Sequence, residues 1–160
     1  MKTNLHKAFR TTVTALGLLM VGTLGSAAEA GNRKFYATEN LFTGGQALTA
    51  CAPGYHMASL WEILNPTTLT YNTTLGFVVG DSGSGPPDLA GRIRTGYVEG
   101  GNPAAGVGNC HAWTSSADTD WGTLVSLSAN WVANSTSISP WIAQVVTCDR
   151  PQLVWCVSDR

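Results

Sequence analysis

Four cysteines constrain this chain more than any other feature of its sequence. They are Cys51, Cys110, Cys148 and Cys156, and all of them lie after the first thirty residues, which have the pattern of an export leader. An even number of cysteines in an exported chain indicates a disulfide framework. Four cysteines allow three pairings, and the residues alone leave all three open.

A zinc site is the alternative use of these cysteines. Zinc-binding cysteines usually occur as close pairs, with about two to four residues between them. The nearest pair in this chain, Cys148 and Cys156, has seven residues between its members. The spacing therefore favours disulfides.

The leader has the three parts of a secretory signal peptide. Lys2, Lys7 and Arg10 precede an apolar run at residues 13–25, and the small residues of segment 28–30 follow it. The run is shorter than the roughly 20 residues that a membrane-spanning helix needs. We therefore expect cleavage after Ala30, a secreted or periplasmic location, a bacterial origin and no membrane insertion of the mature chain.

The mature chain, residues 31–160, has the size of one domain. A chain of 130 residues buries roughly two thirds of its unfolded surface, so we expect a single core. Removal of the leader takes away three basic residues and Glu29, which leaves six basic and nine acidic residues. Nucleic-acid binding requires a basic stripe on the surface. The charge balance therefore predicts no nucleic-acid partner.

Short strands and long loops are indicated along the mature chain. Runs rich in Val, Thr and aromatic residues are interrupted by Gly, Pro, Asn and Ser. The expected strands are residues 33–38, 92–98, 111–115, 124–127, 142–147 and 153–157. Short helices are expected at 45–51 and 59–64, the second with Ser59 as its N-cap, and long loops at 80–91 and 99–108.

Three segments around the cysteines resemble C-type-lectin-like domains. Residues 47–63 (ALTACAPGYHMASLWEI) are similar to the first-helix signature, in which a cysteine closes a short helix before a glycine, a small strand and a second helix. Residues 148–157 (CDRPQLVWCV) resemble the last strand of that fold, including its endostatin branch, and residues 110–113 (CHAW) lie between the two. The order of the cysteines matches the family pattern over about 105 residues.

This resemblance implies an α+β, C-type-lectin-like fold with short antiparallel strands and two short N-terminal helices. It also implies two nested disulfides, Cys51–Cys156 and Cys110–Cys148. Sugar-binding members of the family hold calcium through a Glu-Pro-Asn or Gln-Pro-Asp tripeptide and a Trp-Asn-Asp tripeptide, and this chain has neither. The basic heparin face and the zinc histidines of endostatin are missing as well. We therefore expect no metal and no other cofactor.

The six tryptophans of the mature chain are the best sign of a binding surface. Trp61 and Trp155 lie in the helix and strand motifs that we expect to face the core. The other four are the candidate ligand-binding residues, because the family usually places its ligand face in this part of the chain: Trp113, Trp121, Trp131 and Trp141. Aromatic rings stack on sugars or anchor peptides, although a small β domain also uses them to fill its core.

Polar residues offer weaker candidates. Asp118 and Asp120 could give two oxygens to a hard cation, but a solvated or turn role is favoured. His56 lies beside Met57 in a segment expected to be buried, which favours a hydrogen-bonded core histidine over a ligand. His111, next to Cys110 in the sequence, fits a binding role or none.

These features predict an extracytoplasmic, non-catalytic recognition or surface domain that binds carbohydrate or protein. A secreted hydrolase is the first alternative, because residues 80–85 (GDSGSG) are close to the nucleophile loop of trypsin-like proteases, with Ser82 as the nucleophile. The mature chain is too short for the two barrels of that family. A carboxylate pair, Glu62 with Glu99 or Asp88, would be another catalytic device. A structural surface protein is the second alternative.

Overall fold

The computed structural model describes residues 32–65, 68–78, 86, 88–127 and 141–159, which form a mixed sheet. The seven strands are β1 (Arg33–Ala37), β2 (Tyr55–Met57), β3 (Leu69–Tyr71), β4 (Gly91–Arg92), β5 (Trp121–Leu127), β6 (Trp141–Thr147) and β7 (Leu153–Ser158). Their order is β3-β1-β7-β4-β5-β6, and β2 also pairs with β7. The helical elements are η1 (Gly44–Thr49), α1 (Leu60–Ile63) and α2 (Cys110–Trp113). The predicted α+β class is confirmed.

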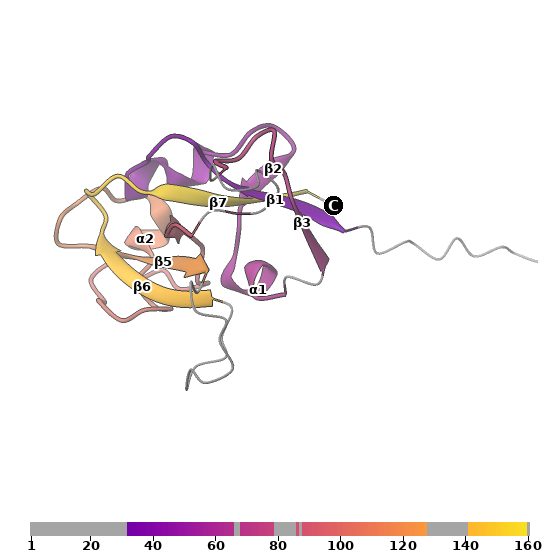
Figure 1. Cartoon of the computed structure of the whole chain (residues 1–160). Helices are drawn as coiled ribbons and strands as arrows, with labels where there is room; N and C mark the ends of the chain where they lie inside the picture. Colours follow the sequence, from indigo (N-terminus) through magenta and orange to yellow (C-terminus); the bar gives the residue numbers. More distant parts are fainter. Residues whose placement is uncertain (1–31, 66–67, 79–85, 87, 128–140, 160) are drawn as a thin grey trace, which may run out of the picture.

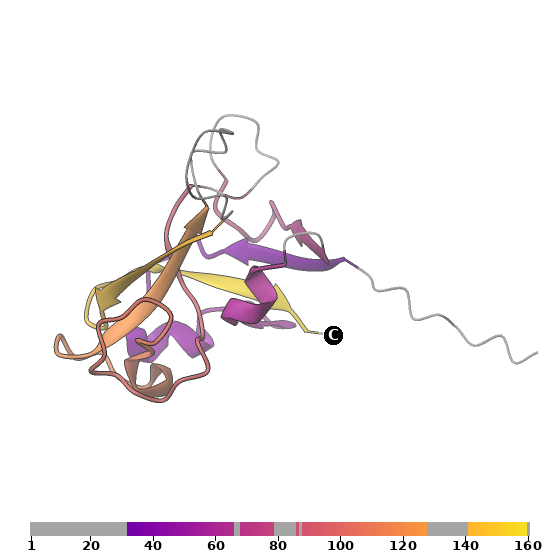
Figure 2. The ribbon, with the colours of Figure 1, turned by 90° about the horizontal axis from the view of Figure 1, so that it is seen from below.

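Strand β7 forms the centre of the sheet and is buried on both faces. It pairs antiparallel with β1 and β2 and parallel with β4. Because side chains alternate along a strand, Leu153, Trp155 and Val157 enter one core cluster, while Val154 and Cys156 enter another. Figure 1 shows β7 between the group of β1, β2 and β3 and the group of β5, β6 and α2. In the view from below, the short helix α1 lies in front of the sheet (Figure 2), and its Leu60 and Ile63 belong to the core cluster that contains Trp155.

The two disulfides are nested, as the resemblance implied. Cys51 is bonded to Cys156 and Cys110 to Cys148, so no cysteine is free. Three of the four cysteines are buried in the same cluster, on the Val154 face of β7. The outer bridge ties the segment after η1 to the central strand, and the inner bridge ties α2 to the end of β6.

The two helices expected early in the chain are confirmed as short helical segments. Ser59 caps α1: its Oγ accepts a hydrogen bond from the Glu62 backbone N–H, and the Glu62 carboxylate accepts one from the Ser59 backbone N–H. This reciprocal pair satisfies two donors that a helix N-terminus otherwise leaves unpaired. The segment expected at 45–51 is the 3-10 helix η1, which begins at Gly44.

The expected strand at 111–115 is wrong, because this segment forms the single turn α2. All four residues from Cys110 to Trp113 have positive φ angles, from 45° to 65°. Each non-glycine residue in this left-handed region costs roughly 1–2 kcal/mol. Two attachments hold the turn in place: Cys110 is bonded to Cys148, and the ring of Trp113 is buried in the core.

The expected strand at 92–98 is mostly wrong. Strand β4 covers only Gly91 and Arg92, and beyond it Arg94 makes a single bridge to Ser59. The chain then turns at Gly96, which has a φ of 87° that favours glycine. The other four expected strands are confirmed as β1, β5, β6 and β7, with ends that differ by up to three residues.

Loop 99–108 contains neither helix nor strand, as predicted, whereas the expected loop 80–91 falls largely outside the described residues. No helix in the described ranges is long and apolar enough to cross a membrane.

Candidate functional site

A hollow of about 220 Å³ lies beside the outer disulfide. We call it the Phe42 pocket. Its walls come from the end of β1, the segment that follows β1, the segment that follows η1, and one later residue: Tyr36, Thr38, Glu39, Asn40, Phe42, Ala50, Cys51, Ala52 and Leu75. Pockets for drug-sized ligands are usually about 300–1,000 Å³, so this one fits a smaller unit.

The pocket is built on fixed backbone. The Tyr36 hydroxyl accepts a hydrogen bond of 2.7 Å from the Ala52 backbone N–H, which joins β1 to the segment after η1. The Thr38 hydroxyl donates to the Asn40 carbonyl at 2.8 Å and accepts from the Val154 N–H at 3.0 Å. Burial raises the pKa of the Tyr36 hydroxyl above its usual value. These hydrogen bonds hold the pocket residues from Tyr36 to Asn40 in place.

Two polar side chains are available to a ligand. Glu39 and Asn40 are exposed, and neither side chain makes a hydrogen bond or ion pair with another described residue. Phe42 lies beside them, held by backbone hydrogen bonds to Gln152 in both directions, at 2.8 and 2.9 Å. Burial raises the pKa of Tyr71, a hydrogen bond from the Ala37 backbone N–H partly opposes this shift, and the Glu39 charge adds to it. A carboxylate, an amide and an aromatic ring thus gather at one hollow.

A second polar cluster surrounds Glu62 on α1. Its carboxylate lies against four side chains from different parts of the chain: Arg33 at 2.8 Å, His56 at 3.0 Å, Ser59 at 2.7 Å and Arg94 at 3.8 Å. His56 also bonds Asp159 through Nδ1 at 2.6 Å. His56 is hydrogen-bonded, as predicted, although it is half-buried rather than buried. The cluster joins β1, β2, α1 and the C-terminal segment.

Glu62 stays ionised in this cluster. Burial by itself raises its pKa, but hydrogen bonds from Ser59, Arg33 and His56 outweigh burial and lower the pKa from 4.5 to about 2. A glycosidase acid needs a carboxyl that carries a proton near neutral pH. Glu62 is therefore a structural anion, and its neighbours already occupy both oxygens.

We expect the Glu62 cluster to make stability depend on acid pH. Because the folded pKa lies below the unfolded value, the stabilisation is fully present above about pH 4.5 and is lost as the pH falls through about 2. Denaturant unfolding at a series of pH values should show the difference between the natural protein and Glu62→Gln shrinking across this range. A difference that stays constant would contradict the assignment.

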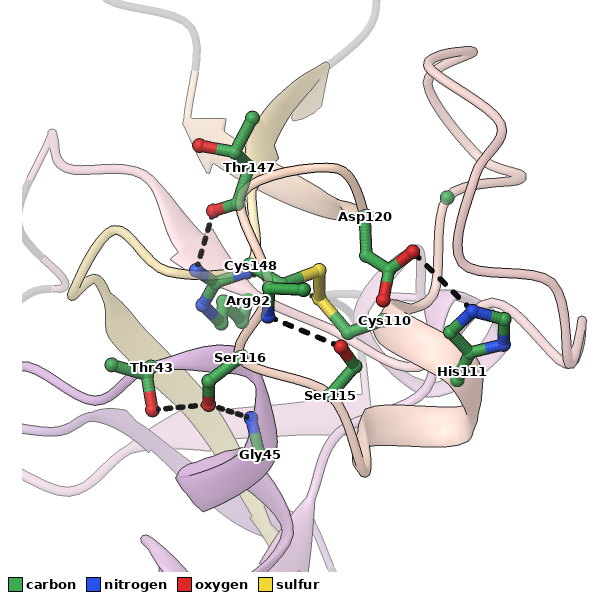
Figure 3. Close-up of a disulfide and its surroundings, with 12 residues drawn as sticks. Thr43, Gly45, Arg92, Cys110, His111, Ser115, Ser116, Asp120, Thr147 and Cys148 are labelled. Carbon is green, nitrogen blue, oxygen red and sulfur yellow. Dashed lines mark hydrogen bonds and ion pairs between the residues drawn. A yellow bond between two sulfur atoms is a disulfide. The ribbon is translucent and has the colours of Figure 1, made fainter.

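A third polar group lies at the inner disulfide (Figure 3). The side chains of His111 and Asp120 point toward one another, and their Nε2 and Oδ1 atoms are 3.3 Å apart. Gly100 makes room for them, since a Cβ there would lie 2.5 Å from the His111 ring. The pair consists of an exposed imidazole and a largely buried carboxylate. No hydroxyl among the described residues hydrogen-bonds the His111 ring, so a nucleophile partner is missing there.

Arg92 lies fully buried behind the same disulfide. Its guanidinium donates to the carbonyls of Arg150 at 2.6 Å, Thr147 at 3.2 Å and Phe42 at 3.4 Å. It also lies 5.6 Å from the centre of the Trp113 ring. Burial lowers the pKa of Arg92 to about 10, and the charge of Asp149 partly opposes this shift. Arg92 therefore joins the segment at Phe42 to the segment from Thr147 to Arg150 through hydrogen bonds, which is a structural role rather than a ligand-binding one.

The described candidate tryptophans differ in exposure. Trp113 and Trp141 are 2% and 4% exposed, which fits the alternative use of these rings to fill the core. Trp121 is half-buried on β5, and its contact with a ligand stays a prediction. Trp131 lies outside the described residues.

Of the two tryptophans expected in the core, one is buried and the other is exposed. Trp155 is fully buried, as predicted, and donates to the Val125 carbonyl at 2.9 Å. Trp61 is 76% exposed, which overturns its assignment to the core. On the four-residue helix α1, Leu60 and Ile63 face the core instead.

The remaining candidates form no catalytic pair among the described residues. Ser82 lies outside the described residues. Glu99 and Asp88 are exposed, and Glu62 is fully engaged. Asp118 is exposed while Asp120 pairs with His111, and the described part of the chain holds no group of three side chains that could bind a metal ion.

Comparisons with known proteins found no match: no family model, no curated protein and no solved structure resembles this chain closely enough to count.

The Phe42 pocket was missed by the sequence analysis. Residues 39–42 (ENLF) form an ordinary polar connection after a strand, and only the fold places them against the segment at Cys51.

Proposed function

We propose that this chain is an extracytoplasmic, non-catalytic recognition or surface domain of the C-type-lectin-like fold, in its endostatin-like branch. It binds carbohydrate or protein without the calcium site of sugar-binding lectins. The nested disulfides and the leader support an exported domain of this kind. The missing calcium tripeptides support binding that does not depend on a metal.

The observation that carries the proposal is the Phe42 pocket. Glu39 accepts hydrogen bonds, Asn40 both donates and accepts them, and Phe42 offers an apolar ring. A saccharide unit presents hydroxyl groups around an apolar ring face, which matches this set. The pocket volume of about 220 Å³ favours one small unit, such as a single sugar ring, over an extended peptide. Carbohydrate is therefore the preferred ligand class for this site.

We expect neutral saccharides to bind at this pocket. In an NMR titration of the disulfide-bonded mature protein with glucose, galactose and N-acetylglucosamine, the backbone amides of residues 38–42 should shift. Asn40→Ala should weaken binding about tenfold, because a pocket hydrogen bond to the ligand is lost.

Leu48→Ala is the matched control, since Leu48 is exposed on the neighbouring η1 and does not line the pocket. Saccharide shifts that are equal in Asn40→Ala and Leu48→Ala would place binding elsewhere. No shift with any of the three sugars would overturn carbohydrate recognition at this site.

A further inference from the structure

Among the described strands, β6 forms one edge of the sheet, and its sequence has no feature that prevents pairing at that edge. It has seven residues, whereas the strand at the other edge, β3, has three. The β6 sequence WIAQVVT contains no charged residue and no proline. Natural edge strands commonly use charges, proline or short length to prevent pairing with another chain. This strand has none of these protections.

Hydrogen bonds of β5 show which peptide groups of β6 point outward. Thr123 on β5 donates to the Gly108 carbonyl and accepts from the Ile93 N–H, so its peptide groups face away from β6. The direction of the peptide groups alternates along a strand, so the N–H and C=O groups of Gly122 and Leu124 face β6. Gly122 pairs with Val146, and Leu124 pairs with Gln144.

It follows that the N–H and C=O groups of Ala143 and Val145 point away from β5, toward the open edge. Among the described residues, neither has a backbone hydrogen bond outside the β5·β6 ladder. Peptide groups at a sheet edge are a template for a further strand.

The side chains along β6 agree with an open edge. Trp141 is buried, and its ring packs edge-to-face against the ring of Trp155 with 5.3 Å between the ring centres. The next three residues, 142–144, are all exposed. Alternation alone would bury every second residue. Ile142 is 45% exposed on the outer face, where it lies two residues from Gln144. Residues 142–144 of β6 are thus exposed, and no described strand pairs with their outer edge.

We propose that β6 pairs with β6 of a second copy of this chain, antiparallel, so that two sheets join into one. With the two-fold axis at Gln144, Ala143 lies opposite the partner's Val145, and both use their outward peptide groups. Ile142 then lies opposite the partner's Val146, and this contact covers the exposed Ile142 side chain. Because the strand is uncharged, the two-fold arrangement brings no like charges together. This self-complementarity favours a second copy over a foreign peptide.

This inference goes beyond the proposed function and stands or falls separately from it. The test is sedimentation equilibrium of the disulfide-bonded mature protein over a range of concentrations. The natural protein should show a monomer–dimer equilibrium. Gln144→Lys places two lysines face to face at the axis, and it should raise the dimer dissociation constant by about tenfold or more.

Val145→Pro is the second variant, and it keeps the test decisive if the first disturbs folding. The Val145 N–H points outward, so proline removes no bond to β5 and is tolerated there as in other edge strands. It should abolish the dimer while circular dichroism stays unchanged. Leu48→Lys, on exposed η1, is the control and should dimerise like the natural protein.

Three outcomes would overturn the proposal. The natural protein could remain a monomer at every concentration. It could form a dimer that Gln144→Lys and Val145→Pro leave intact, which would place the interface elsewhere. It could also remain a monomer and bind an extended peptide at β6, which would make the edge a peptide site.

Discussion

Replacing Cys51 and Cys156 by alanine is expected to lower the free energy of unfolding by about 5 kcal/mol. The bridge closes a loop with a sequence separation of 105 residues, and the loss of chain entropy in the unfolded state grows with loop length. The corresponding double replacement of Cys110 and Cys148, with a separation of 38, should lower it by about 4 kcal/mol. Small domains have only about 5–15 kcal/mol in total, so the first variant should be close to unfolded.

Denaturant unfolding of the two double variants, read by tryptophan fluorescence, checks this order. The fully reduced natural protein is the reference for the loss of both bridges together, since no side chain is shortened in it. An outer-bridge variant as stable as the natural protein would show that the bridge constrains little. Greater loss from the inner bridge would show that native-state contacts around α2 outweigh loop entropy.

Replacing Arg92 by alanine is expected to lower the free energy of unfolding by about 3–5 kcal/mol. The guanidinium is the hydrogen-bond donor for the carbonyls of Phe42, Thr147 and Arg150, and the whole side chain is buried. Its removal takes a donor from all three carbonyls and opens a cavity beside Trp113, although Phe42 keeps the Gln152 N–H and Thr147 keeps the Arg150 N–H as donors. Arg92→Lys should recover little, because an ammonium group lacks the planar fork that reaches two loops at once.

Arg150→Ala is the matched control for Arg92. Its side chain is exposed, and only its backbone carbonyl, which alanine retains, contacts Arg92. Its cost should stay within about 0.5 kcal/mol. Thermal or denaturant melts of the three variants separate the possibilities. Equal stability of Arg92→Ala and Arg150→Ala would show that the hydrogen bonds and packing of Arg92 contribute little to stability.

Local signals predicted the parts of this fold that depend on a few neighbouring residues. Ser59 and Glu62, three residues apart, form the cap of α1 as expected, because a capping box needs only its own segment. The run at 153–157 is apolar at every position, which is typical of a strand covered on both faces, and β7 is such a strand. The cysteine count and the leader likewise gave the disulfide framework, while the resemblance supplied the pairing.

The turn α2 could not be predicted, because its backbone is unfavourable by itself. No local propensity favours four successive non-glycine residues with positive φ. Cys148 and the pocket for the Trp113 ring come from distant parts of the chain, and they hold this conformation only after the fold is complete. The Phe42 pocket also depends on the complete fold, since the hydrogen bond from the Ala52 N–H to the Tyr36 hydroxyl brings the segment at Cys51 against β1 and the residues that follow it.

The sequence by itself determined where α1 begins, which segments form four of the strands and that the cysteines form disulfides. Only the tertiary structure decided which tryptophans are buried. In α1 two apolar pairs have helical spacing, Leu60 with Ile63 and Trp61 with Leu64, and either pair could face inward. The first pair packs against the sheet, which leaves Trp61 in solvent. Burial depends on the surface that a distant segment presents, and a local pattern does not contain that information.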